Sequence, residues 1–231
     1  MLHAMENIMN DTHARAPIPL EPVKVHIADP SDGLLKTADL NTPIPVEVKV
    51  WEAAEPGYFF QLVLDGHSVG TTRVITEADK PGDSITVLLP HQLLDTQGDY
   101  QLGYRASSPL ADSHKLSPMI PLRVDRTPPG AALLAPIIFP TATFGERLVG
   151  RIPGYAGMEA GDTVHTLLNG TPGPSHIIQP AELSDQPLDI VFERDELDDL
   201  TDKPLTVEYR VSDRAGNVSR LSAGVMLDVK L

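Results

Sequence analysis

The chain has 231 residues, with 32 acidic against 18 basic side chains and a formal net charge of −14. This balance argues against binding to nucleic acid or to anionic membrane surfaces, both of which favour lysine and arginine. The sequence has no cysteine, which excludes disulfides and thiolate zinc sites. It also has no apolar run of the about 18 residues that a membrane-spanning helix needs.

The first 18 residues intersperse polar side chains such as His3, Glu6 and Asn7 among apolar ones, and we expect a flexible arm there. They lack the apolar stretch of about 7 to 15 residues that marks a signal peptide. Three interpretations stay open: the protein is retained in the cell, it leaves by a route without that signal, or the chain is cut from a longer one.

Short segments of alternating apolar and polar residues follow, which is the pattern of half-buried strands. They predict strands at residues 23–27, 40–51, 59–64, 71–76, 85–89, 100–106 and 120–124. Short strands separated by turn signals such as Asp65-Gly66 are typical of a β-sandwich. The 22 prolines suit loops and edge positions and discourage long helices.

Two adjacent prolines, Pro128 and Pro129, cannot lie in a central strand and predict a stiff connector. A second series of alternating segments begins after it. These segments predict strands at residues 133–139, 147–152, 163–168, 188–192, 206–211 and 225–229.

The two series are copies of one another. At an offset of 105 residues, Tyr104-Arg105 falls on Tyr209-Arg210 and Leu116-Ser117 falls on Leu221-Ser222. At an offset of 104, the hairpin Leu64-Asp65-Gly66 falls on Leu168-Asn169-Gly170. A repeat of this length predicts two domains. We expect an arm at 1–18, domain 1 at 19–125, a joint at 126–130 and domain 2 at 131–231.

Several phrases resemble bacterial immunoglobulin-like (Ig-like) repeats. Residues 207–219, V-E-Y-R-V-S-D-R-A-G-N-V-S, are similar to their closing hairpin, and 124–128 to the joint between tandem repeats. Residues 153–162 resemble a phrase from pseudomonad surface proteins, and 95–102 resemble the corner before the sixth Ig strand. The resemblance covers about residues 20–231 and implies an all-β fold of two tandem Ig-like antiparallel β-sandwiches.

The resemblance implies a non-catalytic interaction or spacer protein, adhesin-like and placed outside the cell or on its surface. Its partner would be another, unidentified protein, with no nucleic acid and no membrane insertion, and the chain would be a monomer or part of a larger assembly. The alternative is an accessory or docking module of a phage tail, a secretion apparatus or a secreted enzyme.

The resemblance also singles out two acids. In some Ig-like arrays, acids of the joint and of the closing turn bind calcium, and Asp125 and Asp213 match these positions. Ser108 replaces the turn acid in the first copy, so we expect no metal and no other cofactor. Calcium at Asp125 and Asp213 is the alternative, and otherwise both residues form turns.

One segment matches a catalytic motif. Gly66-His67-Ser68-Val69-Gly70 fits G-x-S-x-G, the nucleophile elbow of serine hydrolases, which needs a helix after the serine. The β-branched residues 71–76 predict a strand instead, so we expect a hairpin and no enzyme, with a serine hydrolase using Ser68 as the minor alternative. The eight histidines show no H-E-x-x-H motif, which leaves a zinc protease unsupported. The acidic run 193–202 predicts one helical turn whose acids are solvated.

Overall fold

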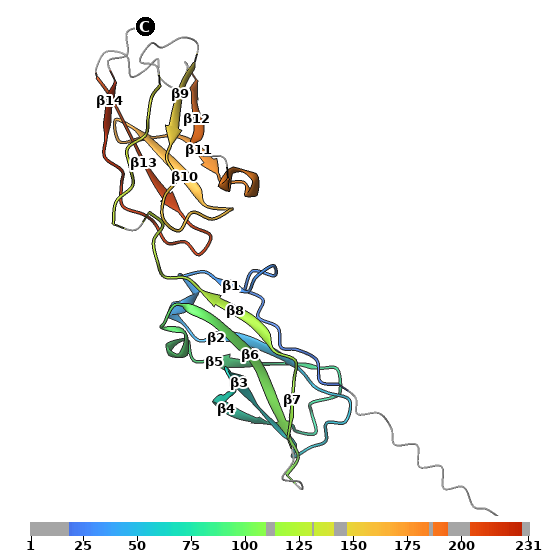
Figure 1. Ribbon diagram of the computed structural model, residues 1–231. Coiled ribbons are helices and arrows are strands. Elements are labelled where there is room, and N and C mark those ends of the chain that lie inside the picture. The colour runs from blue at the N-terminus through green and yellow to red at the C-terminus, as the bar shows by residue number, and fades with distance from the viewer. Residues whose placement is uncertain are drawn as a thin grey trace, which may run out of the picture.

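The computed structural model describes residues 19–109, 114–130, 132–140, 147–184, 187–193 and 204–227. These residues are all-β, as predicted from the sequence (Figure 1). Their only helices are short 3-10 turns, η1 (Asp39–Asn41), η2 (His91–Leu94) and η3 (Pro180–Leu183). None of the helices in this part of the chain has the length and apolar character to cross a membrane.

The first sandwich is built from two facing sheets. One pairs β2 (Ile44–Lys49) with β5 (Ser84–Leu89). The other has the order β1 (Leu34–Leu35), β8 (Ile120–Val124), β6 (Gly98–Ser107), β3 (Phe59–Leu64), β4 (His67–Val74), with β7 (His114–Leu116) on β6. All pairs are antiparallel except β1 with β8, which is parallel.

The second sandwich repeats this plan. β9 (Arg147–Ile152) pairs with β12 (Leu188–Glu193), and the other sheet runs β11 (Thr171–Ile177), β10 (Thr163–Leu168), β13 (Leu205–Ser212), β14 (Val225–Leu227). In both halves a two-stranded sheet, whose strands are separated in the chain by a hairpin of the other sheet, faces a sheet whose order follows the Ig-like sandwich. The chain is therefore two tandem Ig-like sandwiches, placed end to end (Figure 1).

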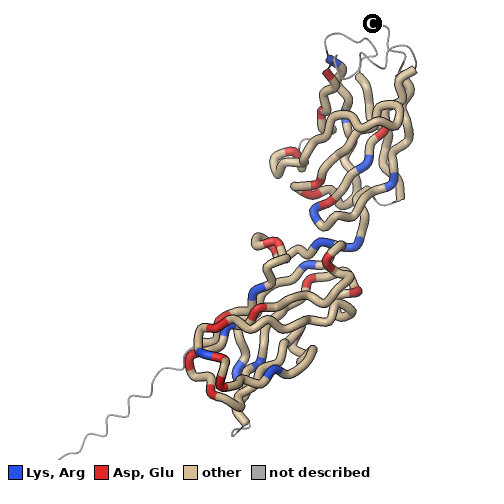
Figure 2. The backbone as a smooth tube through the Cα atoms, turned by 180° about the vertical axis from the view of Figure 1, so that it is seen from behind, with Lys and Arg blue, Asp and Glu red and all other residues tan. Residues whose placement is uncertain are grey.

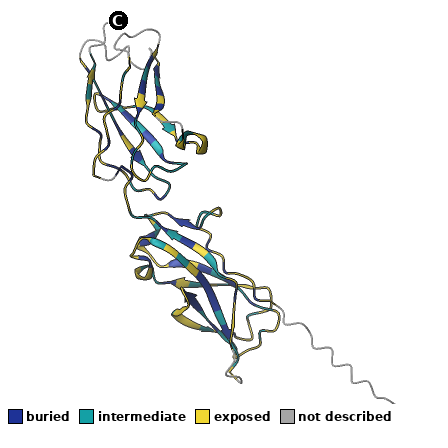
Figure 3. Ribbon diagram, viewed as in Figure 1, coloured by how far each residue is buried: buried dark blue, intermediate teal, exposed yellow. Residues whose placement is uncertain are grey.

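The core residues form two separate clusters, one inside each sandwich (Figure 3). Alternation along each strand turns one set of side chains inward, so Tyr104 and Tyr209 are fully buried while Gln101 and Arg210 are exposed. No described member of the core that alternation predicts is exposed. This predicted core comprises Val48, Leu62, Leu64, Val87, Leu102, Tyr104 and Val124 in the first sandwich and Ile190, Phe192, Val207, Tyr209, Val211, Leu227 and Val229 in the second. Val87 and Leu227 are half-buried, and Val229 lies outside the described residues.

Equivalent hydrogen bonds confirm the repeat. Asp65 accepts from the Gln101 N–H at 2.8 Å, and Asn169 accepts from the Thr206 N–H at 2.8 Å. Each residue has a positive φ, 47° and 51°, and is followed by a glycine at 81°, which is the geometry of a two-residue hairpin turn. Likewise, the Tyr104 and Tyr209 N–H groups each donate to a buried serine hydroxyl 13 residues later, at 3.0 Å.

The duplicated tyrosines differ at their hydroxyl groups. The Tyr209 O–H donates to the Ala135 carbonyl at 2.7 Å, whereas the buried Tyr104 hydroxyl has no partner among the described residues. We expect Tyr209→Phe to lower the free energy of unfolding by about 1–2 kcal/mol, because it leaves a carbonyl unpaired. Tyr104→Phe is expected to be neutral or stabilising. Denaturant unfolding of the two variants tests this, and an equal loss in both would contradict the assignment.

Three predicted strands are wrong in part. Residues 23–27 and 133–139 form no strand, and each contributes a single bridge, Lys24 to Glu47 and Ile138 to Arg151. Prolines in or beside these segments remove ladder donors. In the segment 40–51, Leu40 lies in η1 and the strand begins only at Ile44. The predicted helical turn at 193–202 falls almost wholly outside the described residues.

The corner before the sixth strand is confirmed. The Tyr100 hydroxyl donates to the Thr96 carbonyl four residues earlier, at 2.6 Å. This is the tyrosine corner of Ig-like sandwiches. Its counterpart in the second copy, Leu205, is buried instead.

Candidate functional site: the joint between the sandwiches

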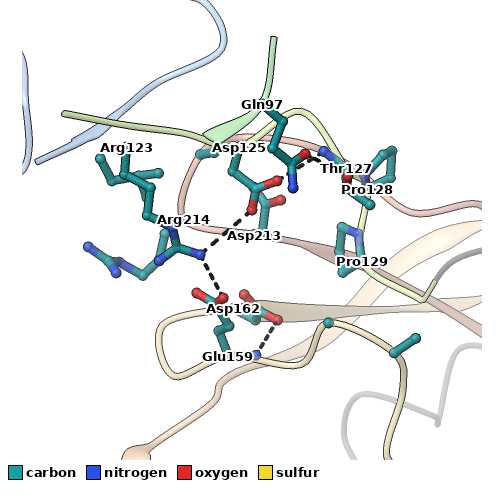
Figure 4. A pocket seen from close by; sticks show the side chains of 14 residues that line it. Gln97, Arg123, Asp125, Thr127, Pro128, Pro129, Glu159, Asp162, Asp213 and Arg214 are labelled. Atoms are coloured by element: carbon teal, nitrogen blue, oxygen red, sulfur yellow. Dashed lines mark hydrogen bonds and ion pairs between the residues drawn. The ribbon is translucent and has the colours of Figure 1, made fainter. Parts of the chain in front are cut away.

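The joint, residues 126–130, follows β8 and Asp125 and enters the second sandwich beside a cavity of about 230 Å³ (Figure 4). Hydrogen bonds connect the joint to both sandwiches. The Arg126 side chain donates to the Leu94 carbonyl at 3.1 Å, and the Gly130 N–H donates to the Ala156 carbonyl at 2.8 Å. The two prolines between these anchors restrict the backbone.

Arg214 crosses the joint from the second sandwich to the first. Its two terminal nitrogens donate to Asp32 at 2.8 and 3.0 Å, and one of them also donates to Asp29 at 2.8 Å. A planar guanidinium that binds a carboxylate with two parallel hydrogen bonds fixes orientation as well as distance. These contacts raise the pKa of Arg214 and lower that of Asp32, while hydrogen bonds from Ser31, followed by Arg214, lower the pKa of Asp29.

Arg123 crosses the joint in the opposite direction. From β8 of the first sandwich it donates to Glu159 of the second at 2.6 Å. It also lies 3.4 Å from Asp32 and 4.0 Å from Asp125. The pKa of Arg123 is raised, chiefly by Glu159.

Together these side chains form the joint network, which comprises Asp29, Asp32, Arg123, Glu159 and Arg214. Figure 2 shows basic and acidic residues of both sandwiches gathered where the two meet. The members are each partly shielded from water, with the Arg214 and Asp32 side chains only 25% and 29% exposed. Opposed pairs that cross the joint in both directions resist tilting of one sandwich against the other.

The turn 213–217 positions Arg214. Gly216 has a φ of 92°, and Asp213 accepts from the Asn217 N–H at 2.8 Å, as the sequence predicted. The backbone of this turn contacts the first sandwich directly. The Thr37 N–H donates to the Ala215 carbonyl at 2.9 Å, and the Asn217 side chain donates to the Asp125 carbonyl at 3.1 Å.

Glycine at position 161 makes room for the Arg214 side chain. A Cβ there would lie 2.8 Å from Arg214 Cδ, which is too close. In the first sandwich the matching glycine, Gly57, lies instead beside Pro109, whose Cγ would be 3.9 Å from such a Cβ. The crossing arginine therefore belongs to the second copy alone.

The loop 29–32, which contains Asp29 and Asp32 and is called the acidic loop below, also belongs to one copy. Lys24 lies 23 residues before its bridge partner Glu47, whereas Ile138 lies 13 residues before Arg151. The extra residues of the first sandwich contain Asp29, Asp32 and β1. No strand parallel to β14 is seen in the described part of the second sandwich.

The two predicted site residues meet at the joint. Asp125 and Asp213 both line the cavity, but their carboxylates already accept hydrogen bonds, from the Thr127 N–H and from Asn217 respectively. Calcium takes about six to eight oxygen ligands, and no group of three or more acids or histidines in the described ranges has the arrangement of a metal site. The donors present do not fit calcium, and the expectation that no metal binds at Asp125 and Asp213 stays a prediction to be measured.

Melting with and without millimolar calcium is that measurement. We expect the melting temperature of the wild-type protein to be unchanged. A bound ion would raise it with concentration by mass action, and the rise would disappear in Asp213→Ala. Such an Asp213-dependent rise would establish a calcium site.

The catalytic motif does not form an elbow. Ser68 is exposed in β4, directly after the hairpin turn at Asp65-Gly66, and β4 runs to Val74 as a strand. The helix that would support an oxyanion is absent from this segment. The hairpin prediction is confirmed there.

Sequence comparison finds no matching family model and no similar curated protein. Solved structures with a similar fold include fibronectin(III)-like modules of Clostridium thermocellum CbhA, with 12% identity, a TM-score of 0.45, and coverage of 90% of this chain and 93% of that one. A structure from a 1.5-MDa bacterial ice-binding adhesin has 14% sequence identity and a TM-score of 0.45. The match covers 90% of this chain and 65% of that chain. The FN1–FN3 domains of chicken CNTN1 have 9% sequence identity and a TM-score of 0.40, with 92% of this chain and 69% of that chain covered. Likeness at this level concerns the fold alone.

Proposed function

We propose that the chain is a non-catalytic spacer and interaction protein, in which two Ig-like domains, 19–125 and 131–231, are held at a fixed angle by the joint 126–130. The observation that carries this proposal is the joint network. Ion pairs cross in both directions, from Arg214 to Asp29 and Asp32 and from Arg123 to Glu159. A rigid two-domain rod presents the loops at its outer ends to a partner protein at a defined separation. We place it, by the same proposal, in an adhesin-like setting outside the cell.

The proposal is tested by the distance distribution between the sandwiches in solution. Because the chain has no cysteine, dyes attached to Thr72→Cys on β4 and Thr171→Cys on β11 label only those exposed positions. Single-molecule energy transfer should give one narrow population over at least part of the range of pH and salt concentration tested. A broad distribution at every pH and salt concentration would refute the fixed angle.

A further inference from the structure

Asp162 is a buried carboxylate behind the joint. It is 1% exposed and precedes β10. One carboxylate oxygen accepts from the Tyr155 O–H at 2.8 Å and from the Glu159 N–H at 3.1 Å. The other, Oδ1, is buried and has no hydrogen-bond partner among the described residues. Leaving such an oxygen unpaired is costly, and much more so when the group carries a charge.

The charged groups around Asp162 do not neutralise it. On its own loop lie Tyr155 and Glu159. On the turn 213–217 lie Asp213 and Arg214, while Arg123 lies on β8 and Asp125 directly after it (Figure 4). The segment after β11 contributes only a backbone contact, from the Ile178 N–H to the Asp162 carbonyl. Both arginines pair with other acids, and no ion pair of Asp162 is seen in the described residues. An ionised Asp162 therefore faces Glu159 and Asp213 without a cation of its own.

The position of Asp162 connects its charge to the joint. Its carboxylate holds the N–H of Glu159, the residue that pairs with Arg123 across the joint. Its other acidic neighbour, Asp213, begins the turn that contacts Thr37 and the Asp125 carbonyl. The loop and the turn that a negative charge would repel are thus the two segments that hold the first sandwich.

We propose that Asp162 makes the rigidity of the joint depend on pH: the two sandwiches are docked tightly while Asp162 is neutral and loosen when it ionises. This inference rests on the proposed function, since it names the regulation of the same joint.

The pKa shifts agree with this direction. Burial raises the pKa of Asp162, so its neutral form persists above the ordinary range of a carboxyl group. The pKa of Asp32 is lowered, chiefly by Arg214, so the ion pairs of the joint stay charged in the same window. The contribution of a neutral Asp162 to docking is therefore fully present below the ordinary carboxyl pKa and is lost as pH rises through its raised pKa.

Energy transfer between the dyes at positions 72 and 171 tests the proposal in a pH series that runs upward from the ordinary carboxyl pKa, about pH 4, to about pH 8. We expect the wild-type distribution to broaden and shift to lower transfer efficiency as pH rises. Asp162→Asn, which is isosteric and cannot ionise, should stay narrow throughout, and Asp213→Asn should weaken the response. Asp189→Asn, an exposed acid paired with Arg151 away from the joint, should respond as the wild type does.

The outcomes separate the two proposals. A wild-type distribution that is narrow at every pH overturns the pH dependence and leaves the rigid rod intact. A response that survives in Asp162→Asn also overturns it. A distribution that is broad at every pH refutes the rod itself.

Discussion

Replacing Arg214 with alanine is expected to release the two sandwiches from one another while both stay folded. The substitution removes three hydrogen bonds to Asp29 and Asp32 and leaves Asp32 with only the longer contact to Arg123, at 3.4 Å. Hydrogen bonds between charged groups contribute about 1.5–3 kcal/mol when sheltered and less when exposed. For this partly exposed cluster we expect a docking loss of about 2 kcal/mol.

Single-molecule energy transfer should then show a broad population of interdomain distances. Arg210→Ala is the matched control, because Arg210 lies on β13 close to the same turn but is exposed. It should leave the narrow population unchanged. The double variant with Asp32→Ala should lose less than the sum of the single changes, since the two residues act together. Strict additivity would show that the pair does not interact in solution.

Gly33→Ala is expected to destabilise the first sandwich by about 3 kcal/mol or more, the largest loss we expect from a methyl group added at any described glycine. Gly33 has a φ of 76°, which an alanine adopts only with strain. An added Cβ would also lie 2.2 Å from the Pro121 carbonyl oxygen, so the backbone of β8 has to move. Since Gly33 follows Asp32, the acidic loop should shift away from Arg214.

Gly66→Ala separates the cost of backbone strain from the cost of a steric clash. Gly66 has a φ of 81° but nothing lies within 4 Å of an added Cβ. We expect it to cost only about 1 kcal/mol, from backbone strain alone. Thermal melting measures both losses, and the dye pair should detect loosening in Gly33→Ala only. Similar losses in the two variants would show that the contact with Pro121 is relieved without cost.

The fold was largely predictable because the alternation that marks most strands can be seen within short segments of the sequence. Alternation over 59–64, 120–124, 147–152 and 163–168 matches strands β3, β8, β9 and β10 in full. The offset between Tyr104 and Tyr209 identified the repeat, and the same serine contact follows each tyrosine. Prediction failed where a strand needs a partner that local sequence does not specify, as at 23–27 and 133–139.

The joint network could not be predicted in the same way. Arg214 and Asp29 are 185 residues apart in the sequence. Residues 213–217, Asp-Arg-Ala-Gly-Asn, have the composition of a turn, and Asp29-Pro30-Ser31-Asp32 has that of an ordinary loop. Neither composition indicates a contact with the other sandwich. The one available signal was the arginine itself, because its counterpart in the first copy is Pro109. At this turn the first copy has Ser108 and Pro109 where the second has Asp213 and Arg214, and such a gain of charged residues in one copy indicates that its turn has acquired a contact.

The acidic loop and β1 belong to the first sandwich and the crossing arginine to the second, so the pair has a direction. The domains arose as copies but are no longer interchangeable. A permuted chain with the second sandwich first would bring Pro109, rather than Arg214, to the connection and would meet it with a segment that lacks Asp29 and Asp32. Because the loop with Asp29 and Asp32 lies in one unit and the turn with Arg214 in the other, the two units are complementary only in the order in which this chain has them.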